Sequence, residues 1–264
     1  MFGNSMQTSA IPERVYALCR EVVSRPMDEN SLKLLLEPQN LGGKTPYFGT
    51  VRTAAEQLQL INTKENMISL AVDKDVVKSI DNMRHYINMH LELVSDSLFY
   101  MVTQGYLDMG TDVLGHNSVS KMSDVMGRYI GVKVKEDDMR AWRFWMAFLG
   151  FGYMHEPQAG AAGILLPNTA IFLRDIIESL KFKKKTKYRI DEFVDVIMPY
   201  AKIALHNAVD TKKFNYGFSN AIRMLNDLGV IKAEHRLDAQ EIWSLHPCEG
   251  HDLETTVTHI TIGG

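Results

Sequence analysis

A short signature occurs three times along this chain: a leucine ending an amphipathic stretch, one small or polar residue, and then an apolar run. It reads Leu58-Gln59-Leu60-Ile61, Leu149-Gly150-Phe151 and Leu228-Gly229-Val230-Ile231. The leucine can pack the end of a helix on a core. The residue after it must turn the chain sharply, and glycine tolerates the positive φ of such a turn. Each copy therefore predicts a helix that ends abruptly and passes directly into a strand.

The first copy lies in a region with helical spacing before it and a hairpin pattern after it. Pro12 suits the first turn of a helix, and Asp28 or Asn30 can cap a second one. Residues 60–70 read as a hairpin whose polar turn is Lys64-Glu65-Asn66. We expect residues 1–73 to form one unit of three helices and a β wing, the helices covering 12–24, 28–37 and 47–59.

The last copy predicts the same plan at the C-terminal end. Tyr188-Arg189-Ile190 reads as a short strand, Asp191 can cap the next helix, and residues 201–209 read as a further helical stretch. A third helix is expected over 215–228. Residues 230–245 read as a wing that turns near Leu237-Asp238-Ala239, so we assign 188–264 to a unit with a C-terminal strand.

The middle copy predicts a similar unit over 118–167. Its helices would cover 119–129 and 139–149, the second capped by Asp137 or Asp138, and its wing strands 153–156 and 163–166. The aromatic density here could equally reflect a buried domain interface. Residues 74–117 are expected to be a helical spacer with helices at 74–93 and 95–106. Residues 168–187 are expected to be a linking helix and a basic connector.

This pattern resembles the winged helix-turn-helix superfamily, in tandem copies. The resemblance implies a mainly α fold with small β wings and helical spacers between the units. The opening, from Pro12-Glu13-Arg14-Val15 to Ala54-Ala55-Glu56-Gln57-Leu58, also looks faintly like accessory proteins of prokaryotic anti-phage or DNA-modification systems. Fold alone does not settle function.

In winged helix-turn-helix proteins the start of the third helix enters the major groove of DNA. The candidate DNA-binding residues of the first unit are therefore the polar and basic side chains at that start, with one wing lysine: Lys44, Thr45, Tyr47, Thr50, Arg52 and Lys64. The alternative is a helix that only packs and whose polar face is solvated.

The C-terminal unit has a comparable set, Lys212, Lys213, Asn215, Asn220 and Arg223, and a lysine run, Lys183, Lys184, Lys185 and Lys187. Such a run could neutralise several phosphates and give salt-dependent affinity. It could also be a solvated connector between domains. Glu234, Asp238 and Glu241 on the expected wing would repel phosphate, which favours a protein-facing surface there.

Overall charge limits the DNA hypothesis. The 29 Lys and Arg against 32 Asp and Glu give a formal net charge of −3, whereas sequence-independent nucleic-acid binders are usually basic. Any contact with DNA must therefore come from local patches.

Other classes of protein are disfavoured. Two distant cysteines without a CxxC exclude a disulfide framework and fit a reducing cytoplasm. No signal peptide or apolar span for a membrane is evident. The chain has no P-loop, no GxSxG and no HExxH, so we expect no enzyme and no cofactor. The spacing of His246, Cys248 and His251 matches no common structural zinc site, so we expect no metal.

The sequence thus predicts a non-catalytic, cytoplasmic component of a prokaryotic defence or genome-maintenance complex, with double-stranded DNA and other proteins as its partners. One alternative is a protein-protein scaffold whose winged helices never touch DNA. Another is a transcriptional regulator.

Overall fold

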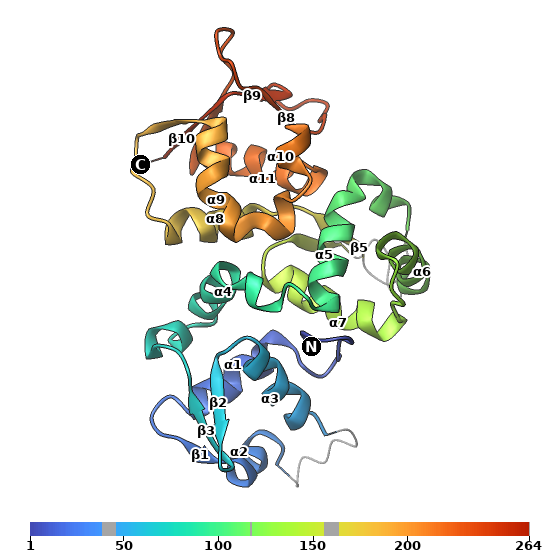
Figure 1. Cartoon of the computed structure of the whole chain (residues 1–264), viewed down its shortest axis with the longest axis vertical. Coiled ribbons are helices and arrows are strands. Elements are labelled where there is room, and N and C mark those ends of the chain that lie inside the picture. The colour runs from blue at the N-terminus through green and yellow to red at the C-terminus, as the bar shows by residue number, and fades with distance from the viewer. Residues whose placement is uncertain (39–45, 117, 156–163, 264) are drawn as a thin grey trace.

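The N-terminal unit has the order helix, strand, helix, helix, strand, strand (Figure 1, blue to cyan). The computed structural model describes residues 1–38, 46–116, 118–155 and 164–263. The elements of this unit are α1 (Pro12–Glu21), β1 (Met27–Asp28), α2 (Glu29–Leu36), α3 (Phe48–Gln57), β2 (Ile61–Lys64) and β3 (Met67–Leu70). The predicted helices and hairpin are confirmed, while β1 is a strand that the sequence pattern did not indicate.

The three strands of this unit form an antiparallel sheet in the order β1-β3-β2. The hairpin turn is Glu65-Asn66, whose φ angles are 51° and 64°, as two-residue hairpin turns require. Asp28 caps α2, since its Oδ1 accepts from the backbone N–H groups of Asn30 and Ser31 at 3.0 and 3.1 Å. Of the two predicted caps, Asp28 is therefore the one that caps α2, and Asn30 lies within the helix.

The predicted continuous helix over 74–93 is wrong. Three short helices replace it: η2 (Lys74–Val77), α4 (Ile80–Met89) and η3 (Leu91–Val94). The break lies at Ser79, whose Oγ accepts from the N–H of Asn82 at 3.0 Å and so starts α4 afresh. The segment still buries one apolar side across the break, because Val77, Met83, Ile87 and Leu91 are all buried.

The middle region consists of helices and one hairpin (Figure 1, green to yellow). Its elements are α5 (Leu98–Asp108), η4 (Gly110–Gly115), α6 (Val119–Ile130), α7 (Glu136–Phe148), β4 (Gly152–His155) and β5 (Ile164–Pro167). The sheet β4-β5 has two antiparallel strands in the described residues, as the sequence predicted. Trp142 and Trp145 are 1% and 0% exposed, so both are core residues.

Trp145 also lies at an interface with the N-terminal segment. Phe2 packs edge-on against Phe99 and Trp145, with ring centroids 5.2 and 4.8 Å apart. The indole N–H of Trp145 donates to the carbonyl of Ala10 at 2.6 Å, and the N–H of Met6 donates to Asp138 at 2.7 Å. The aromatic density therefore serves a core and a domain interface together.

The C-terminal unit repeats the order of the first one, with additions (Figure 1, olive to red). Its elements are α8 (Ala170–Ser179), β6 (Lys187–Arg189), α9 (Ile190–Leu205), α10 (Ala208–Thr211), α11 (Tyr216–Asp227), β7 (Ile231–Glu234), β8 (Trp243–Ser244), β9 (Thr256–Val257) and β10 (His259–Ile262). Its main sheet is antiparallel in the order β6-β10-β7, so the first strand again pairs with the third.

The wing of this unit differs from the prediction. β7 does not pair with residues near Leu245; it pairs with β10, with Ile231 opposite Ile262 and Glu234 opposite His259. The long connection carries its own small ladder, β8 with β9. Trp243 and Leu245 are buried at 3% each, so this segment packs inward rather than returning as the second wing strand.

Two helices begin earlier than predicted, α7 by three residues and α9 by two. α7 starts at Glu136 and α9 at Ile190. In each, the third residue is a carboxylate that accepts from the backbone N–H before the helix: Asp138 from Lys135 at 2.9 Å and Glu192 from Arg189 at 3.0 Å. This is one half of a capping box, and Asp191 is not the cap.

A buried carboxylate joins the spacer to the C-terminal unit. Asp175 on α8 is fully buried, and its partners all lie on α4. Arg84 Nε is 2.8 Å from its Oδ2, His85 Nε2 is 2.7 Å from Oδ1, and the Asn88 amide donates to Oδ2 at 2.9 Å. Because α8 also packs on α9 and α11, this helix is part of the C-terminal core as well as a link.

Candidate nucleic-acid interface

The start of α3 is held mainly by contacts within its own unit. The Tyr47 hydroxyl donates to the carbonyl of Leu36, and the Arg14 guanidinium lies 4.0 Å from the centre of its ring. Thr50 donates to the carbonyl of Tyr47 at 2.8 Å, and its Oγ1 is 2.7 Å from Ser9 Oγ. Lys44 and Thr45 fall outside the described residues.

Arg52, the one cation on α3, is neutralised by two carboxylates. Its guanidinium is 2.5 Å from Glu29 at the start of α2 and 3.8 Å from Glu56 one turn along α3. Lys64 is exposed on the hairpin beside Glu65. Among its described residues, the first unit therefore has an accessible third helix with little free positive charge around it.

The predicted DNA-contact residues at α11, Asn215, Asn220 and Arg223, are engaged within the protein. Asn215 caps the helix through Phe218 N–H at 2.9 Å, and its amide donates to the carbonyl of Ala204 at 2.7 Å. The Asn220 amide donates to the carbonyl of Pro167 at 3.0 Å. Arg223 is 4% exposed and donates to the carbonyl of His246 at 2.7 Å.

The position of α11 in the fold explains this. The helix packs against α8 and β7 of its own unit, and against α5, η4 and β5 of the middle region. Of the expected cations before it, Lys212 forms an ion pair with Glu241, and Lys213 is exposed while its backbone pairs with Ser244.

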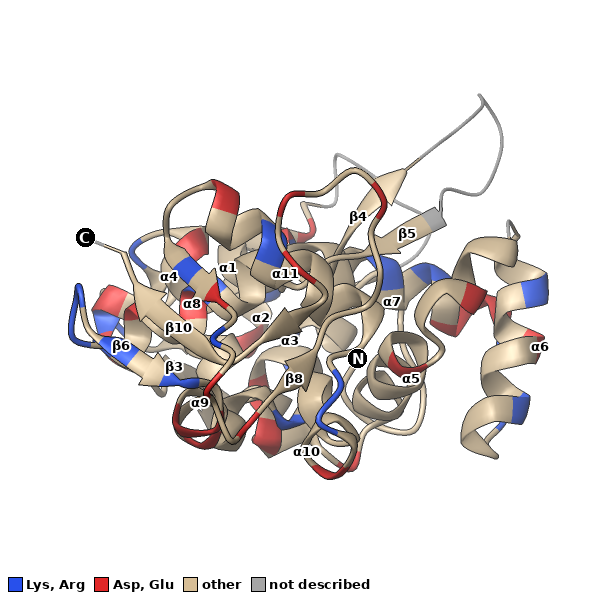
Figure 2. Cartoon of the chain, turned by 90° about the horizontal axis from the view of Figure 1, so that it is seen from above, with Lys and Arg blue, Asp and Glu red and all other residues tan. Residues whose placement is uncertain are grey.

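The segment between α8 and β6 carries the densest positive charge, and we call residues 181–186 the lysine loop. Its lysines, Lys181, Lys183, Lys184 and Lys185, are all exposed, and within the described part of the chain none of their ammonium groups forms an ion pair. Lys187, just after the loop, does pair, with Glu234 on β7. Elsewhere in Figure 2 blue and red are intermixed, whereas the loop before β6 is blue alone.

The connection from β7 to β10, residues 235–258, is called the wing loop, and the lysine loop lies at the other end of the sheet. The backbone N–H of Lys185 donates to the carbonyl of Ile262 at 2.9 Å, and the backbone N–H of Ile262 donates to the carbonyl of Thr186 at 3.2 Å. Ile262 is the last residue of β10, and the wing loop precedes the first residue of that strand. The loop and the wing therefore present their side chains at opposite ends of the unit.

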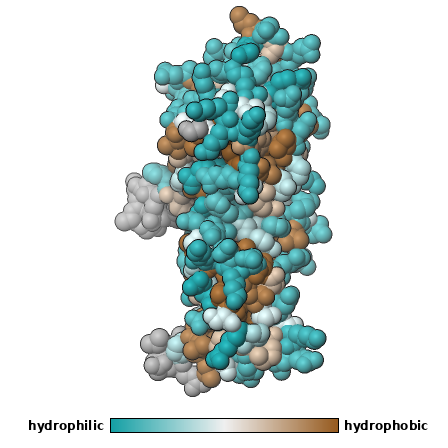
Figure 3. Space-filling model, turned by 90° about the vertical axis from the view of Figure 1, so that its left-hand side faces the viewer, coloured by the Kyte–Doolittle hydropathy of each residue, from teal (hydrophilic) through white to brown (hydrophobic). Residues whose placement is uncertain are grey.

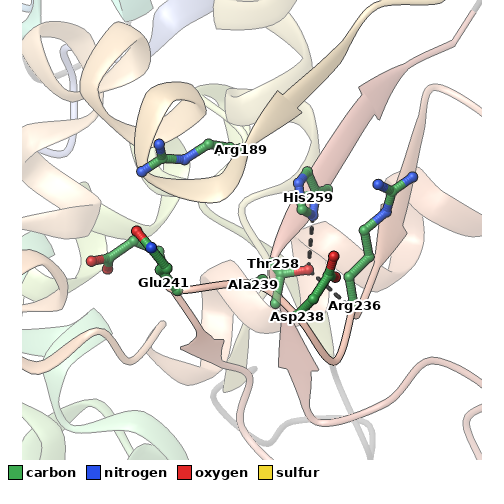
Figure 4. A pocket seen from close by; sticks show the side chains of 8 residues that line it. Arg189, Arg236, Asp238, Ala239, Glu241, Thr258 and His259 are labelled. Carbon is green, nitrogen blue, oxygen red and sulfur yellow. Dashed lines mark hydrogen bonds between the residues drawn. The ribbon is translucent and has the colours of Figure 1, made fainter.

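A polar pocket of about 250 Å³ lies at the wing end (Figure 4). Arg189, Arg236 and His259 contribute cationic or titratable groups, and Asp238 and Glu241 oppose them. Burial, followed by the charges of Arg236 and Lys187, lowers the pKa of His259. Arg189 is already paired with Asp191.

The pocket thus contains both cationic and acidic side chains, and this mixture does not favour the binding of an anion. Thr258 links Arg236 and His259 in the pocket. Its Oγ1 accepts from the backbone N–H of Arg236 at 3.0 Å and is 2.9 Å from His259 Nδ1 (Figure 4). Sequence reasoning missed Arg236 and His259, since β10 returns from far along the chain to bring them together. No group of three or more metal-ligating side chains occurs among the described residues.

Comparisons with known proteins leave the fold as the main guide to function. No protein-family model, no curated protein and no solved structure matches the chain. Of the helices in the described ranges, none has the length and apolarity needed to cross a membrane.

Proposed function

We propose that this chain is a non-catalytic assembly component whose tandem winged-helix-like units bind protein partners rather than read a DNA sequence. The support for winged-helix units is the shared order of elements. In both end units a helix, a strand, two or more helices and two or more strands follow one another, and the first strand pairs with the last. The middle region supports a third, smaller unit with α6, α7 and the β4-β5 hairpin.

The proposal rests on the third helix of each end unit, α3 and α11, and on whether its polar and charged side chains are free to contact a ligand. A sequence-reading helix needs free donors and cations aimed at base edges. The Asn220 amide and Nη2 of Arg223 donate to backbone carbonyls inside the protein, and the Arg223 side chain is buried, so neither residue points at a ligand in solvent. Arg52 is neutralised by Glu29 and Glu56.

Exposed apolar side chains on the first unit favour a protein partner. Leu34 and Leu35 on α2 are each 53% exposed, and Met67 on β3 is 42% exposed. Neighbouring exposed apolar residues on a folded protein often mark an interaction surface. On the resemblance of the N-terminal unit alone, we extend the proposal to an assembly of the prokaryotic defence or DNA-modification type.

One observation favours a second candidate function, which is phosphate contact without sequence specificity. The four lysines of the lysine loop form no ion pair in the described part of the chain. Such a cluster would attract duplex DNA at low salt, and its affinity would fall steeply as salt rises.

Titration of a fluorescent DNA duplex over a range of salt concentrations tests the choice between DNA and protein. The assembly role predicts no binding tighter than about 10⁻⁴ to 10⁻⁶ M at physiological salt. It also predicts that Arg52→Ala changes nothing, and that glutamate at all four loop lysines abolishes any low-salt binding. Nanomolar affinity that Arg52→Ala weakens would refute the proposal.

A direct test of protein contact uses a photo-crosslinking amino acid at Leu35, in cells that express the chain from its natural locus. Discrete protein adducts are expected from this position. The matched control is Asn62, which is exposed on β2 and should give none. Equal labelling at both positions, or none at Leu35, would contradict a partner on this face.

A further inference from the structure

An apolar groove lies beside the lysine loop, at the end of the C-terminal sheet. Its volume is about 530 Å³. The residues that line it come from α8, the lysine loop, the end of α11, the start of β7 and the end of β10: Ile177, Glu178, Lys181, Phe182, Lys184, Leu228, Gly229, Val230, Ile262 and Gly263. This size falls in the range of sites that accept a few side chains or a small ligand.

The apolar lining of the groove runs from buried to exposed side chains: Ile177 and Ile262 are 4% and 5% exposed, whereas Leu228 is open to solvent. Leu228, on its wall, is 60% exposed although it follows directly on the last residue of α11. Gly229 then turns the chain with a φ of 70°, which keeps this end of the helix open. Apolar patches interrupt the hydrophilic surface on the side that carries the end of the chain (Figure 3).

The rim of the groove is positively charged. Lys181 and Lys184 line it and have no ion pair among the described residues. Among the described residues that line the groove, the carboxylate is that of Glu178, which is 3.8 Å from Arg174, so its charge is partly offset. Lys183 and Lys185 belong to the same loop but do not line the groove.

A second hollow of about 460 Å³ adjoins the groove through Gly229 and Gly263. Ile231, Ala233 and Leu253 contribute apolar atoms to it, and Lys232 and Asp252 also line it. Lys232 is paired with Glu234. The two hollows together extend past the end of α11 and provide room for a short peptide segment rather than a single side chain.

We infer that the groove binds an acidic, amphipathic peptide segment of a partner protein. Leucine-type side chains of the segment would cover the floor, while its carboxylates would pair with Lys181 and Lys184. This is helix-in-groove recognition with charge complementarity at the rim. The inference rests on the proposed function and specifies the chemical class of the partner.

A nucleic acid fits the same surface less well. Phosphates gain nothing from an apolar floor, and they would lose hydration against Leu228. A backbone that follows the lysine loop would use Lys183 and Lys185 as much as Lys181 and Lys184. The two pairs of lysines therefore discriminate between the two occupants.

A library of short random peptides displayed on phage, selected against the full chain, tests the inference. Peptides that carry several Asp or Glu residues together with large apolar residues three or four positions apart should be enriched. Their binding should fall at least about tenfold with Leu228→Glu, and again with the pair Lys181→Glu and Lys184→Glu. The matched pair Lys183→Glu and Lys185→Glu should change it by less than about twofold.

Three outcomes would overturn the inference: no enrichment, equal losses for both lysine pairs, or complete displacement of the peptides by duplex DNA at physiological salt. Far-ultraviolet circular dichroism and thermal melting would verify that each variant folds. Leu228→Glu should fold, because Leu228 is exposed. The proposed function fails separately, through DNA binding that depends on Arg52. That residue lies in the other end unit, so the two failures can be told apart.

Discussion

The two end units share one order of elements and one strand order, yet they use their third helices in opposite ways. α3 packs on α1 and β2 and leaves one side of the helix to solvent, whereas α11 also packs on α5, η4 and β5 of the middle region. Gly49 near the start of α3 has nothing within 4 Å of an added Cβ, while Gly217 near the start of α11 faces Leu107 and Pro167. Topology alone therefore does not make a helix available for recognition.

The largest expected difference between these units concerns their cysteines. Cys19 is buried in α1, and burial raises its pKa to about 12. Cys248 is exposed in the wing connection. Because the thiolate is the reactive form, Cys19 should react with a disulfide reagent at least about 10³-fold more slowly than Cys248 does.

Kinetics with Ellman's reagent at pH 8 would show this as one fast thiol and one slow thiol. In Cys248→Ser only the slow phase should remain, and it should report local opening of the first unit. Two fast phases would mean that the packing of α1 is looser than described.

The next largest effect concerns the contact that anchors α8 to α4. Asp175→Ala removes the buried carboxylate that Arg84, His85 and Asn88 share, so Arg84 keeps only the exposed Asp81 and Asn88 keeps only the carbonyl of Leu149. The free energy of unfolding should fall by about 3–5 kcal/mol, measured by urea denaturation. Asp81→Ala is the control, because Asp81 pairs with the same arginine from an exposed position and should cost less than about 1 kcal/mol. Similar losses in both variants would argue against the anchoring role of Asp175.

A matched pair of glycine substitutions examines the comparison of α3 with α11 directly. Gly49→Ala should stabilise the protein by about 0.5–1 kcal/mol, because alanine favours the helix and meets open space. In Gly217→Ala the new Cβ would lie 3.1 Å from Leu107 and 3.2 Å from Pro167, and the crowding should cost about 1–3 kcal/mol. Thermal melting would measure both, and equal gains would show that α11 is not enclosed.

The smallest expected effect is a pH dependence of the C-terminal sheet. Hydrogen bonds from Lys187 and Lys232 lower the pKa of Glu234 to about 2. A depressed carboxyl pKa contributes stability above the unfolded value, near pH 4.5, and this stability is lost as the pH falls toward 2. Since the pair is exposed, the loss should be below about 1 kcal/mol. Glu234→Gln should flatten this part of a stability profile measured from pH 6 to pH 2.

Local structure was largely predictable from the sequence. Asp28 caps α2, Glu65-Asn66 forms the first hairpin turn, and Gly229 turns the chain after α11, all through contacts within a few residues. The four lysines of the lysine loop could likewise be found as a run.

What the sequence did not reveal depends on distant partners. β7 pairs with β10 across a long connection, whereas the sequence pattern favours a nearby segment, up to residue 245, as the second wing strand. Asn220 and Arg223 look like recognition residues on a helical wheel, but Pro167 and His246 engage them from other elements. The groove has the same origin, because Ile177, Leu228 and Ile262 meet only in the folded chain.

The packing of Phe2 between Phe99 and Trp145 has a consequence for synthesis on the ribosome. Residue 2 is made well over a hundred residues before Trp145, which corresponds to a delay on the order of ten seconds at ordinary translation rates. During that interval the first unit can fold from local contacts, while its leading apolar residues still await their binding surface. Chaperones that recognise nascent chains therefore have a defined target in this segment until α7 is complete.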